Sequence, residues 1–222
     1  MFRSRIAALI GLPLVAIAAL AARPARLPER ARAGALPPDS ILKLADAGRV
    51  QGSPTARVWL VEASDFQCPF CKEWHDQSYQ QIVKDYVSTG KIRFAFLNDP
   101  LPMHVHSMQA AEAGMCASAQ GKFWPMHQLL FGTQDHWADL PDVTAYFDSL
   151  AGKAGVDLAA WRQCVRTHAT RPMIEADQDR LRRSGVESTP TFFVGSERIV
   201  GAVPTATFVG ALDSALARAG AH

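Results

Sequence analysis

Two cysteines separated by two residues are the feature of this 222-residue chain that most restricts its fold. The motif Cys68-Pro69-Phe70-Cys71 comes a few residues after the apolar run Val-Trp-Leu-Val at residues 58–61. An uninterrupted apolar run of this kind is typical of a strand buried on both faces, in the centre of a sheet with parallel neighbours. The motif itself opens a long helical pattern that ends at Thr89-Gly90. The sequence therefore predicts a strand, a cysteine pair and a helix in direct succession.

The position of Cys68 at the start of that helix predicts a reactive thiol. Pro69 suits the first helical position, so we expect Cys68 to be the N-cap, beside backbone N–H groups that lack helical partners. The partial positive charge at a helix N-terminus favours the thiolate, which is the form that attacks disulfides. We therefore expect Cys68 to be a nucleophile and Cys71, one turn further on, to close a disulfide with it.

Metal binding is the alternative interpretation of this cysteine pair. A structural zinc site usually needs a second pair at similar spacing, whereas Cys116 and Cys164 each stand alone. His75 is close enough in sequence to be a third ligand, and a dithiol metal-delivery protein would use the same two thiols. His104 and His106 give a weaker metal signal, and we expect them to be turn or surface histidines. We expect neither a metal nor a cofactor in this chain.

The rest of the chain supplies a second strand, a helical region and a hairpin. Residues 91–97 alternate in hydrophobicity and predict a strand. Helical patterns without a strand signal then extend over approximately residues 103–185, with individual helices predicted at residues 108–119, 123–131, 158–165 and 174–181. Ser188-Thr189-Pro190 leads into a predicted hairpin at residues 191–201, and the proline stands where a missing N–H is tolerated. A last helix with one apolar face begins at Pro204.

Taken together, these features resemble the DsbA-like thiol-disulfide oxidoreductases of the thioredoxin superfamily. Three stretches of the sequence carry the resemblance: residues 61–71, 120–124 and 188–194. The resemblance implies an α/β, thioredoxin-like fold at residues 39–220, with a large helical insertion at approximately residues 103–185 between the two halves of the sheet. It also implies an enzyme that exchanges disulfides with other proteins.

The resemblance implies roles for individual residues of the site. Cys68 is expected to be the attacking and more exposed cysteine, and Cys71 its buried partner. Thr189 and Pro190 are expected to form a cis-proline loop that holds an extended substrate segment by backbone pairing. Glu62 corresponds to a buried acid that exchanges a proton with Cys71, which requires a pKa raised by burial. A solvent-exposed glutamate at the end of the strand is the alternative for this residue.

Two further expectations concern redox strength and a second disulfide. Phe70 stands where the best-known oxidant of the family has histidine, so we expect only backbone dipoles and hydrogen bonds to stabilise the thiolate. Relatives with four cysteines imply a structural disulfide between Cys116 and Cys164. An oxidising compartment favours that pairing, and two buried free thiols are the alternative.

The N-terminal residues predict export from the cytosol. Two arginines precede an uncharged, mostly apolar run at residues 6–22, and Ala19-Leu20-Ala21 offers a small-x-small cleavage site. We expect either a cleaved signal peptide at residues 1–21 or an uncleaved membrane anchor at residues 6–22. Either one places the rest of the chain in the periplasm or another extracytoplasmic compartment. Residues 22–38, rich in Ala, Arg and Pro, predict a linker.

The charge balance and the composition limit the classes of partner that the chain can bind. Hydrophobic residues make up 48% of the chain, which is enough for a packed core. The chain has 23 Lys and Arg against 21 Asp and Glu, but Arg3 and Arg5 lie in the N-terminal segment, and without them the counts are equal, which leaves no basic surplus for nucleic acid. We expect reduced, unfolded exported proteins as substrates, a redox partner that recycles the dithiol, and membrane contact only through an uncleaved N-terminal segment. The predicted activity is donation of the Cys68–Cys71 disulfide through a mixed disulfide. A disulfide reductase or isomerase of the same fold and a redox-inactive binding domain are the alternatives.

Overall fold

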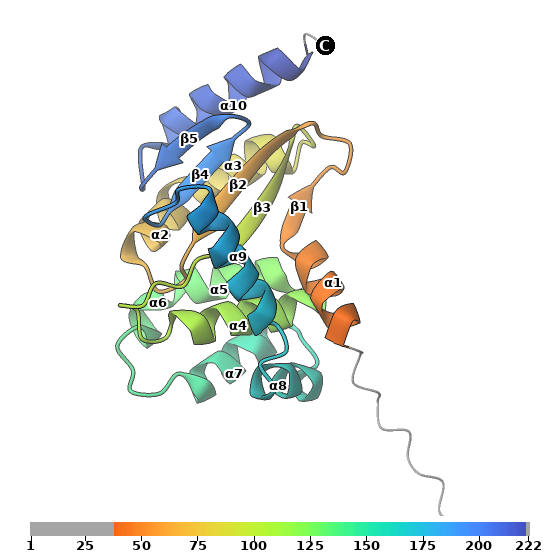
Figure 1. Ribbon diagram of the computed structural model, residues 1–222, viewed down its shortest axis with the longest axis vertical. Helices are drawn as coiled ribbons and strands as arrows, with labels where there is room; N and C mark the ends of the chain where they lie inside the picture. The colour runs from red at the N-terminus through yellow and green to blue at the C-terminus, as the bar shows by residue number, and fades with distance from the viewer. Residues whose placement is uncertain (1–37, 221–222) are drawn as a thin grey trace, which may run out of the picture. The chain divides into compact units, whose positions relative to one another are not determined.

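The computed structural model describes residues 38–220. The expected signal peptide or anchor, and the expected linker up to residue 37, therefore lie outside the described residues. A five-stranded mixed sheet with the strand order β1-β3-β2-β4-β5 forms the centre of the described part of the chain (Figure 1). The α/β, thioredoxin-like fold class predicted from the sequence is confirmed.

The strand before the cysteines, β2 (Val58–Ser64), is the central strand of the sheet. It pairs in parallel with β3 (Ile92–Asn98) and antiparallel with β4 (Thr191–Val194). The apolar run thus correctly indicated a central strand, but one of the two neighbours is antiparallel rather than parallel. Strand β4 continues through a turn into the edge strand β5 (Glu197–Val200), which completes the predicted hairpin.

The opposite edge is β1 (Val50–Gly52), a strand that the sequence did not predict. It pairs antiparallel with β3, and its three residues are too few to show an alternating pattern. Gly52 has a φ of +98°, and a Cβ at this position would lie 2.3 Å from the carbonyl oxygen of Ile92. Glycine is therefore required where the chain leaves β1.

The predicted helix after the cysteines covers residues 69–87, and we call it the active-site helix. It alternates between α-helical and π-helical turns: α2 (Pro69–Trp74), η1 (His75–Tyr79), α3 (Gln80–Ile82) and η2 (Val83–Val87). Together with the C-terminal helix α10 (Thr205–Gly220), it packs on one face of the sheet. Large buried side chains from the two helices and the sheet form this core, among them Trp74, Phe94, Phe192 and Phe208.

The residues between β3 and β4 form the helical region that the sequence predicted. Its helices are α4 (Ser107–Ser118), α5 (Phe123–Gly132), α6 (Gln134–Trp137), α7 (Thr144–Ala154), α8 (Leu158–Arg166) and α9 (Arg171–Arg183). Figure 1 shows α4 to α8 gathered below the sheet, whereas α9 runs upward beside it. Helix α1 (Pro38–Gly48), the first helix among the described residues, packs against α4. The sequence patterns located α4, α5, α8 and α9, but α6 and α7 were missed.

A second core joins these helices to the end of the sheet. Phe66, which precedes the cysteines, stacks on Phe96 of β3 with ring centroids 4.9 Å apart. Cys68 and Cys71 belong to the same core. The cysteine pair therefore lies where the sheet meets the helical region, and side chains of both can surround it.

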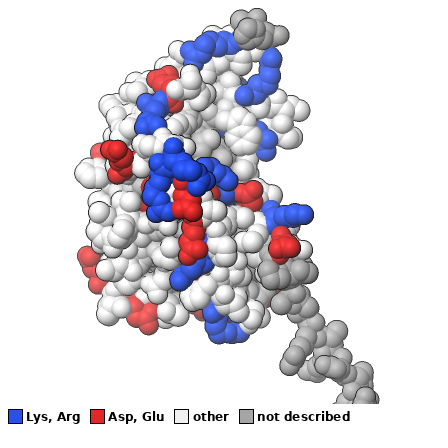
Figure 2. Space-filling view, viewed as in Figure 1, with Lys and Arg blue, Asp and Glu red and all other residues white. Residues whose placement is uncertain are grey.

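Helix α9 is attached to the rest of the fold by a buried charge pair. Asp177 of α9 accepts a hydrogen bond from the guanidinium of Arg49 and another from the backbone N–H of Asn98, at 3.1 Å. Arg49 is 3% exposed and Asp177 is 1% exposed. Elsewhere on α9 the charges are on the surface, and Figure 2 shows basic and acidic side chains side by side over this helix, where Arg182 pairs with Asp179.

Candidate active site

The loop between β2 and the active-site helix places Cys68 at the helix N-terminus. Cys68 is the N-cap, with φ −69° and ψ 125°, and proline follows it in the first turn, as predicted. Gln134 of α6 holds this loop, because its Nε2 donates to the carbonyl oxygens of Phe66 at 2.7 Å and of Cys68 at 3.1 Å. The start of the active-site helix is thus held by a residue from the helical region.

The surroundings of Cys68 favour its thiolate. Its pKa is lowered to about 6, chiefly by a hydrogen bond from the Cys71 thiol. Burial opposes the shift, and the backbone N–H groups of Phe70 and Cys71 add to it. Since ordinary cysteine thiols have a pKa of about 8.5, Cys68 is mainly a thiolate at neutral pH. Phe70 stabilises this thiolate only through its backbone N–H.

The Cys71 thiol has the opposite character. Burial, followed by the neighbouring Cys68, raises the pKa of Cys71 well above its ordinary value. Its sulfur accepts a hydrogen bond from the backbone N–H of Asp65 at 3.5 Å. Cys68 is the more exposed of the two residues, as the resemblance implied, but the difference is only 4% against 0%. The adjacent Phe70, at 60% exposed, is the part of the motif that faces solvent.

The loop before β4 lies against the reactive sulfur. The Thr189–Pro190 peptide bond is cis, and the carbonyl oxygen of Thr189 lies 3.5 Å from Cys68 Sγ. The carbonyl oxygen of Pro190 accepts a hydrogen bond from the backbone N–H of Gly201 at 2.8 Å. The fold thereby brings together two segments that are 121 residues apart in the sequence.

Glu62 is completely buried on β2, opposite Phe96 of β3 and Phe192 of β4. Neither of its carboxyl oxygens has a hydrogen-bond partner of ordinary geometry among the described residues. Burial raises its pKa to about 8, and the neighbouring Ser64 hydroxyl opposes this shift only weakly. The alternative of a solvent-exposed glutamate is wrong, and Glu62 is mainly protonated at neutral pH.

Asp65 is a residue of the site that the sequence did not single out. Its buried carboxylate accepts hydrogen bonds from the backbone N–H groups of Gln67 at 2.8 Å and Leu101 at 2.9 Å, and it lies 2.7 Å from Nδ1 of His104. It therefore joins the loop before the cysteines to the loop after β3. An acidic residue three positions before Cys68, at the end of an apolar strand, was the available signal. Gln134 gave no such signal, because no local sequence pattern connects it with the cysteines.

The histidines considered as metal ligands have protein partners elsewhere. His104 and His106 lie at turns, as expected, and His106 Nε2 is 2.6 Å from the carbonyl oxygen of Leu140. His75 Nδ1 is 3.2 Å from a carboxylate oxygen of Asp76. Within residues 38–220, no group of three or more His, Cys, Asp and Glu side chains is arranged to hold a metal ion.

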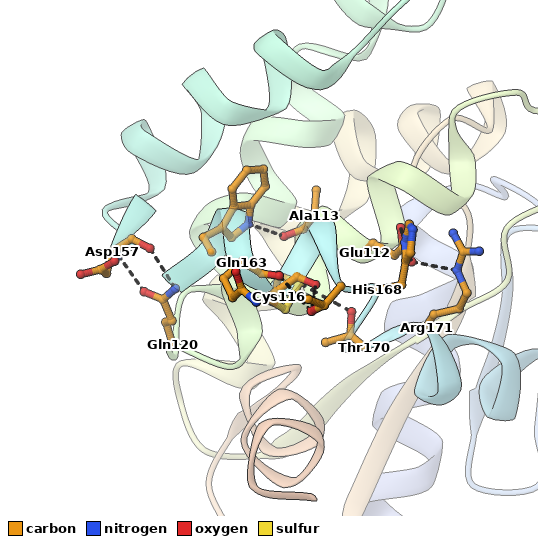
Figure 3. The surroundings of a disulfide bond; sticks show 12 residues. Glu112, Ala113, Cys116, Gln120, Asp157, Gln163, His168, Thr170 and Arg171 are labelled. Atoms are coloured by element: carbon orange, nitrogen blue, oxygen red, sulfur yellow. Dashed lines mark hydrogen bonds and ion pairs between the residues drawn. A yellow bond between two sulfur atoms is a disulfide. The ribbon is translucent and has the colours of Figure 1, made fainter. Parts of the chain in front are cut away.

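The other two cysteines form a disulfide between α4 and α8 (Figure 3). Cys116 and Cys164 have their Cα atoms 5.8 Å apart. On one side of the bond, Trp161 Nε1 donates to the carbonyl oxygen of Ala113 at 3.1 Å. On the other side, the buried carboxylate of Glu112 pairs with Arg171 at 2.9 Å. This disulfide is remote in sequence from Cys68 and Cys71, and both of those thiols are free.

Comparison with known proteins agrees with this geometry. A family profile described as thioredoxin matches residues 45–214, which is most of the chain. The chain belongs to the thioredoxin family. Its fold is that of the DsbA-like thiol-disulfide oxidoreductases within the thioredoxin superfamily.

Solved structures of thioredoxin-like proteins superpose on most of this chain. Oxidised BdbD from Bacillus subtilis has a TM-score of 0.69 at 23% identity, over 77% of this chain and 94% of that one. Alpha-DsbA1 from Wolbachia pipientis has a TM-score of 0.67 at 21% identity, over 77% and 92%. A periplasmic thioredoxin-like protein from Salmonella enterica serovar Typhimurium has a TM-score of 0.61 at 21% identity, over 81% and 96%. At these identities the likeness concerns the fold.

Curated proteins of similar sequence include longer proteins named Na(+)/H(+) antiporter NhaA. The one from Salinispora tropica is 33% identical over 175 residues, which are 78% of this chain and 26% of the antiporter. The one from Salinispora arenicola is 32% identical over 87% of this chain and 29% of the antiporter. This thioredoxin-family chain therefore spans less than a third of these relatives. In the part of the chain that the structure describes, none of the helices has the length and hydropathy needed to cross a membrane.

Proposed function

We propose that this thioredoxin-family chain is an exported protein thiol-disulfide oxidoreductase that donates a Cys68–Cys71 disulfide to reduced proteins. The opposite shifts of the two thiol pKa values, lowered to about 6 for Cys68 and raised for Cys71, carry the proposal. One sulfur is thereby a good nucleophile and leaving group, and the other is a buried thiol that reacts only with its partner. The proposed unit comprises a signal peptide or anchor at residues 1–21, a linker at residues 22–38 and the oxidoreductase domain at residues 39–220.

The reaction follows from these two sulfurs. A substrate thiolate attacks Cys68 Sγ of the disulfide, the bond between Cys68 and Cys71 breaks, and Cys71 takes up a proton. A second substrate thiolate then attacks the substrate sulfur of the mixed disulfide, and Cys68 leaves as a thiolate. Two electrons have then passed from the substrate dithiol to the protein, and the substrate holds a new disulfide.

Two other groups complete the proposed site. We propose that the carboxyl of Glu62, buried on β2 with a pKa of about 8, supplies the proton that Cys71 needs. The loop at Thr189 and Pro190 lies against Cys68, and we propose that its backbone pairs with an extended segment of the substrate. The substrates in this proposal are reduced, unfolded exported proteins, and a separate redox partner restores the disulfide.

The oxidising direction rests on the stability of the reduced form. A protein dithiol is a strong oxidant when its reduced form is stabilised relative to the disulfide, and the lowered pKa of Cys68 is such a stabilisation. Because Phe70 brings no positive charge, this stabilisation comes from hydrogen bonds of the Cys71 thiol, the Thr189 side chain and the backbone of Phe70 and Cys71. A disulfide reductase of the same fold is the second candidate, since the absence of a charged side chain at position 70 favours a weaker oxidant.

Two serine substitutions test the proposal with a reduced, unfolded protein as the substrate. Cys68→Ser is expected to abolish disulfide transfer. Cys71→Ser cannot hold this disulfide, so it is mixed instead with the oxidised, disulfide-bonded form of the same substrate. Attack by the Cys68 thiolate is then expected to accumulate mixed disulfides, because the Cys71 sulfur that would attack Cys68 and release the substrate is missing. Normal turnover by the Cys71→Ser variant, together with an unreactive Cys68 at neutral pH, would contradict the assignment. Both variants are analysed by non-reducing electrophoresis after acid quenching.

A further inference from the structure

Buried ionisable side chains with unpaired polar atoms pack against the aromatic residues of the core that also holds the two cysteines. Both ring nitrogens of His127 and Nε2 of His75 have no hydrogen-bond partner among residues 38–220, and the carboxyl oxygens of Glu62 have none of ordinary geometry there. Buried polar groups in folded proteins are nearly always paired, and an unpaired one destabilises the fold. Three such side chains in one cluster indicate a use beyond packing.

His127 of α5 is the centre of this cluster and is completely buried. Its ring centroid lies 5.0 Å from that of Tyr79 and 5.5 Å from that of His75, both on the active-site helix. On the sheet side it lies 5.3 Å from Phe96, which is the residue paired with Glu62 between β2 and β3. Burial raises the pKa of Tyr79 to about 12, and the carboxylate of Glu62 adds to that shift. His127 therefore lies beside the two residues that neighbour Glu62.

His75 connects the cluster to the surface. Its ring stacks on Tyr79 at 5.1 Å, and the residue is 7% exposed. Its Nδ1 lies 3.2 Å from a carboxylate oxygen of Asp76, whose side chain is 48% exposed. Lys72 binds the other oxygen of the same carboxylate at 2.9 Å. A series of ionisable groups thus leads from a fully buried acid to one in contact with solvent.

We propose that His127 and His75 relay protons between Glu62 and solvent in each redox cycle. The inference rests on the proposed function, because it concerns how Glu62 recovers its proton. After Glu62 has protonated Cys71, it is a buried carboxylate. These groups do not hydrogen-bond to one another directly, so each transfer passes through a bridging water. His127 gives Glu62 the proton of one ring nitrogen and receives another proton from His75 on its second nitrogen. His75 recovers its proton from solvent on the side of the exposed Asp76 carboxylate, whose lowered pKa leaves it with no proton of its own to give. The sequence runs in reverse when the dithiol is reoxidised.

The chemistry of the two imidazoles suits this task. Burial lowers the pKa of His127 far below its ordinary value and also lowers that of His75, so both rings are neutral at pH 7. A neutral imidazole has one donor and one acceptor nitrogen, and it passes a proton without keeping the charge. The titratable groups around His127 are His75, Tyr79 and Glu62, while its other neighbours from α5, β3 and the loop before the cysteines are aromatic. Phenylalanine would fill such a cage without unpaired nitrogens.

The reactions of the two sulfurs can be followed one after the other when the reduced protein is rapidly mixed with an aromatic disulfide that releases a coloured thiolate. Attack by Cys68 releases the first coloured thiolate, and attack by Cys71 on the resulting mixed disulfide releases the second. We expect His127→Phe to leave the first phase unchanged and to slow the second by about tenfold at pH 7, since a positioned proton carrier is removed. His136→Phe, which changes an exposed histidine of α6, is the matched control and is expected to leave both phases unchanged.

A double-mutant cycle with Glu62→Gln distinguishes the relay from a packing role. If His127 acts through Glu62, then His127→Phe has no further effect on the second phase in the Glu62→Gln background. An unchanged second phase in the single variant, or an equal slowing in both backgrounds, would overturn the relay. If His127→Phe does not fold, His75→Phe replaces it in the double-mutant cycle. An unchanged second phase in His75→Phe, or an equal slowing with and without Glu62→Gln, would then overturn the relay. Absence of the second phase in the wild-type protein would instead contradict the proposed function.

Discussion

Cys68 and Cys71 are three positions apart, and their different chemistry comes from where the helix begins. Cys68 is the N-cap and receives hydrogen bonds from the first turn, whereas Cys71 is inside the core. The thiolate at Cys68 could be predicted from the sequence, because a proline after a cysteine fixes the N-cap locally. The burial of Glu62 could be expected only from the family resemblance, since a strand pattern does not tell which acidic residue faces the core.

The pKa of Glu62 predicts a stability that depends on pH. This carboxyl has an ordinary pKa of 4.5 and a folded-state pKa of about 8, so the unfolded chain releases the proton more readily. Its contribution to stability is complete below pH 4.5 and is lost as the pH rises through 8, at about 1.4 kcal/mol for each pH unit between these two values. We expect Glu62→Gln to remove this loss, which makes the variant more stable than the wild type at pH 8 by several kcal/mol.

Urea unfolding of both reduced proteins at pH 5 and pH 8 measures this difference. The comparison between variant and wild type cancels the titration of Cys68, which both proteins share. If the difference in unfolding free energy between Glu62→Gln and the wild type is the same at pH 5 and at pH 8, then Glu62 does not titrate in this range and the prediction is wrong.

Among the elements, those next to the chemistry were the easiest to predict. The central strand β2, the start of the active-site helix and the hairpin of β4 and β5 each have a strong local pattern. The helices α6 and α7 and the edge strand β1 were missed because they are short or weakly patterned. The hydrogen bond from Gln134 to Cys68 joins residues 66 positions apart. No local pattern reveals a contact of that kind, so the support of the active-site loop by α6 needed the structure.

Position 70 lies in the first turn of the active-site helix, so a charged side chain there is expected to act on the Cys68 thiolate. Phe70→His would place a titratable imidazole beside the Cys68 thiolate on a side chain that is 60% exposed. We expect the pKa of Cys68 to fall below about 6 and the reduction potential to become less negative, since ~30 mV corresponds to about 1.4 kcal/mol for this couple. The pH dependence of Cys68 alkylation gives the pKa. Phe70→Leu is the control, and an equal change in both variants would show that the charge is not responsible.

At the scale of the whole molecule, the disulfide between Cys116 and Cys164 joins two helices of the helical region, and its cysteines lie in the same hydrophobic core as Cys68 and Cys71. Replacing both cysteines with alanine is expected to lower the free energy of unfolding by about 2–4 kcal/mol, because the unfolded chain loses a covalent constraint. The pKa of Cys68 should stay the same, since none of its causes involves this region. Urea unfolding and the alkylation profile of Cys68 test the two halves of this prediction. A changed Cys68 pKa would show that the helical region tunes the site through this bond.

The whole account predicts a molecule that gives disulfides rather than one that removes them, and the reduction potential of the Cys68–Cys71 pair measures this most directly. Equilibration with glutathione redox buffers, followed by quantification of the two thiols, supplies the value. We predict a potential less negative than about −200 mV, with the reduced protein more stable to unfolding than the oxidised one. A value near −270 mV, about that of thioredoxin, with the oxidised protein the more stable, would contradict the account and identify a reductase.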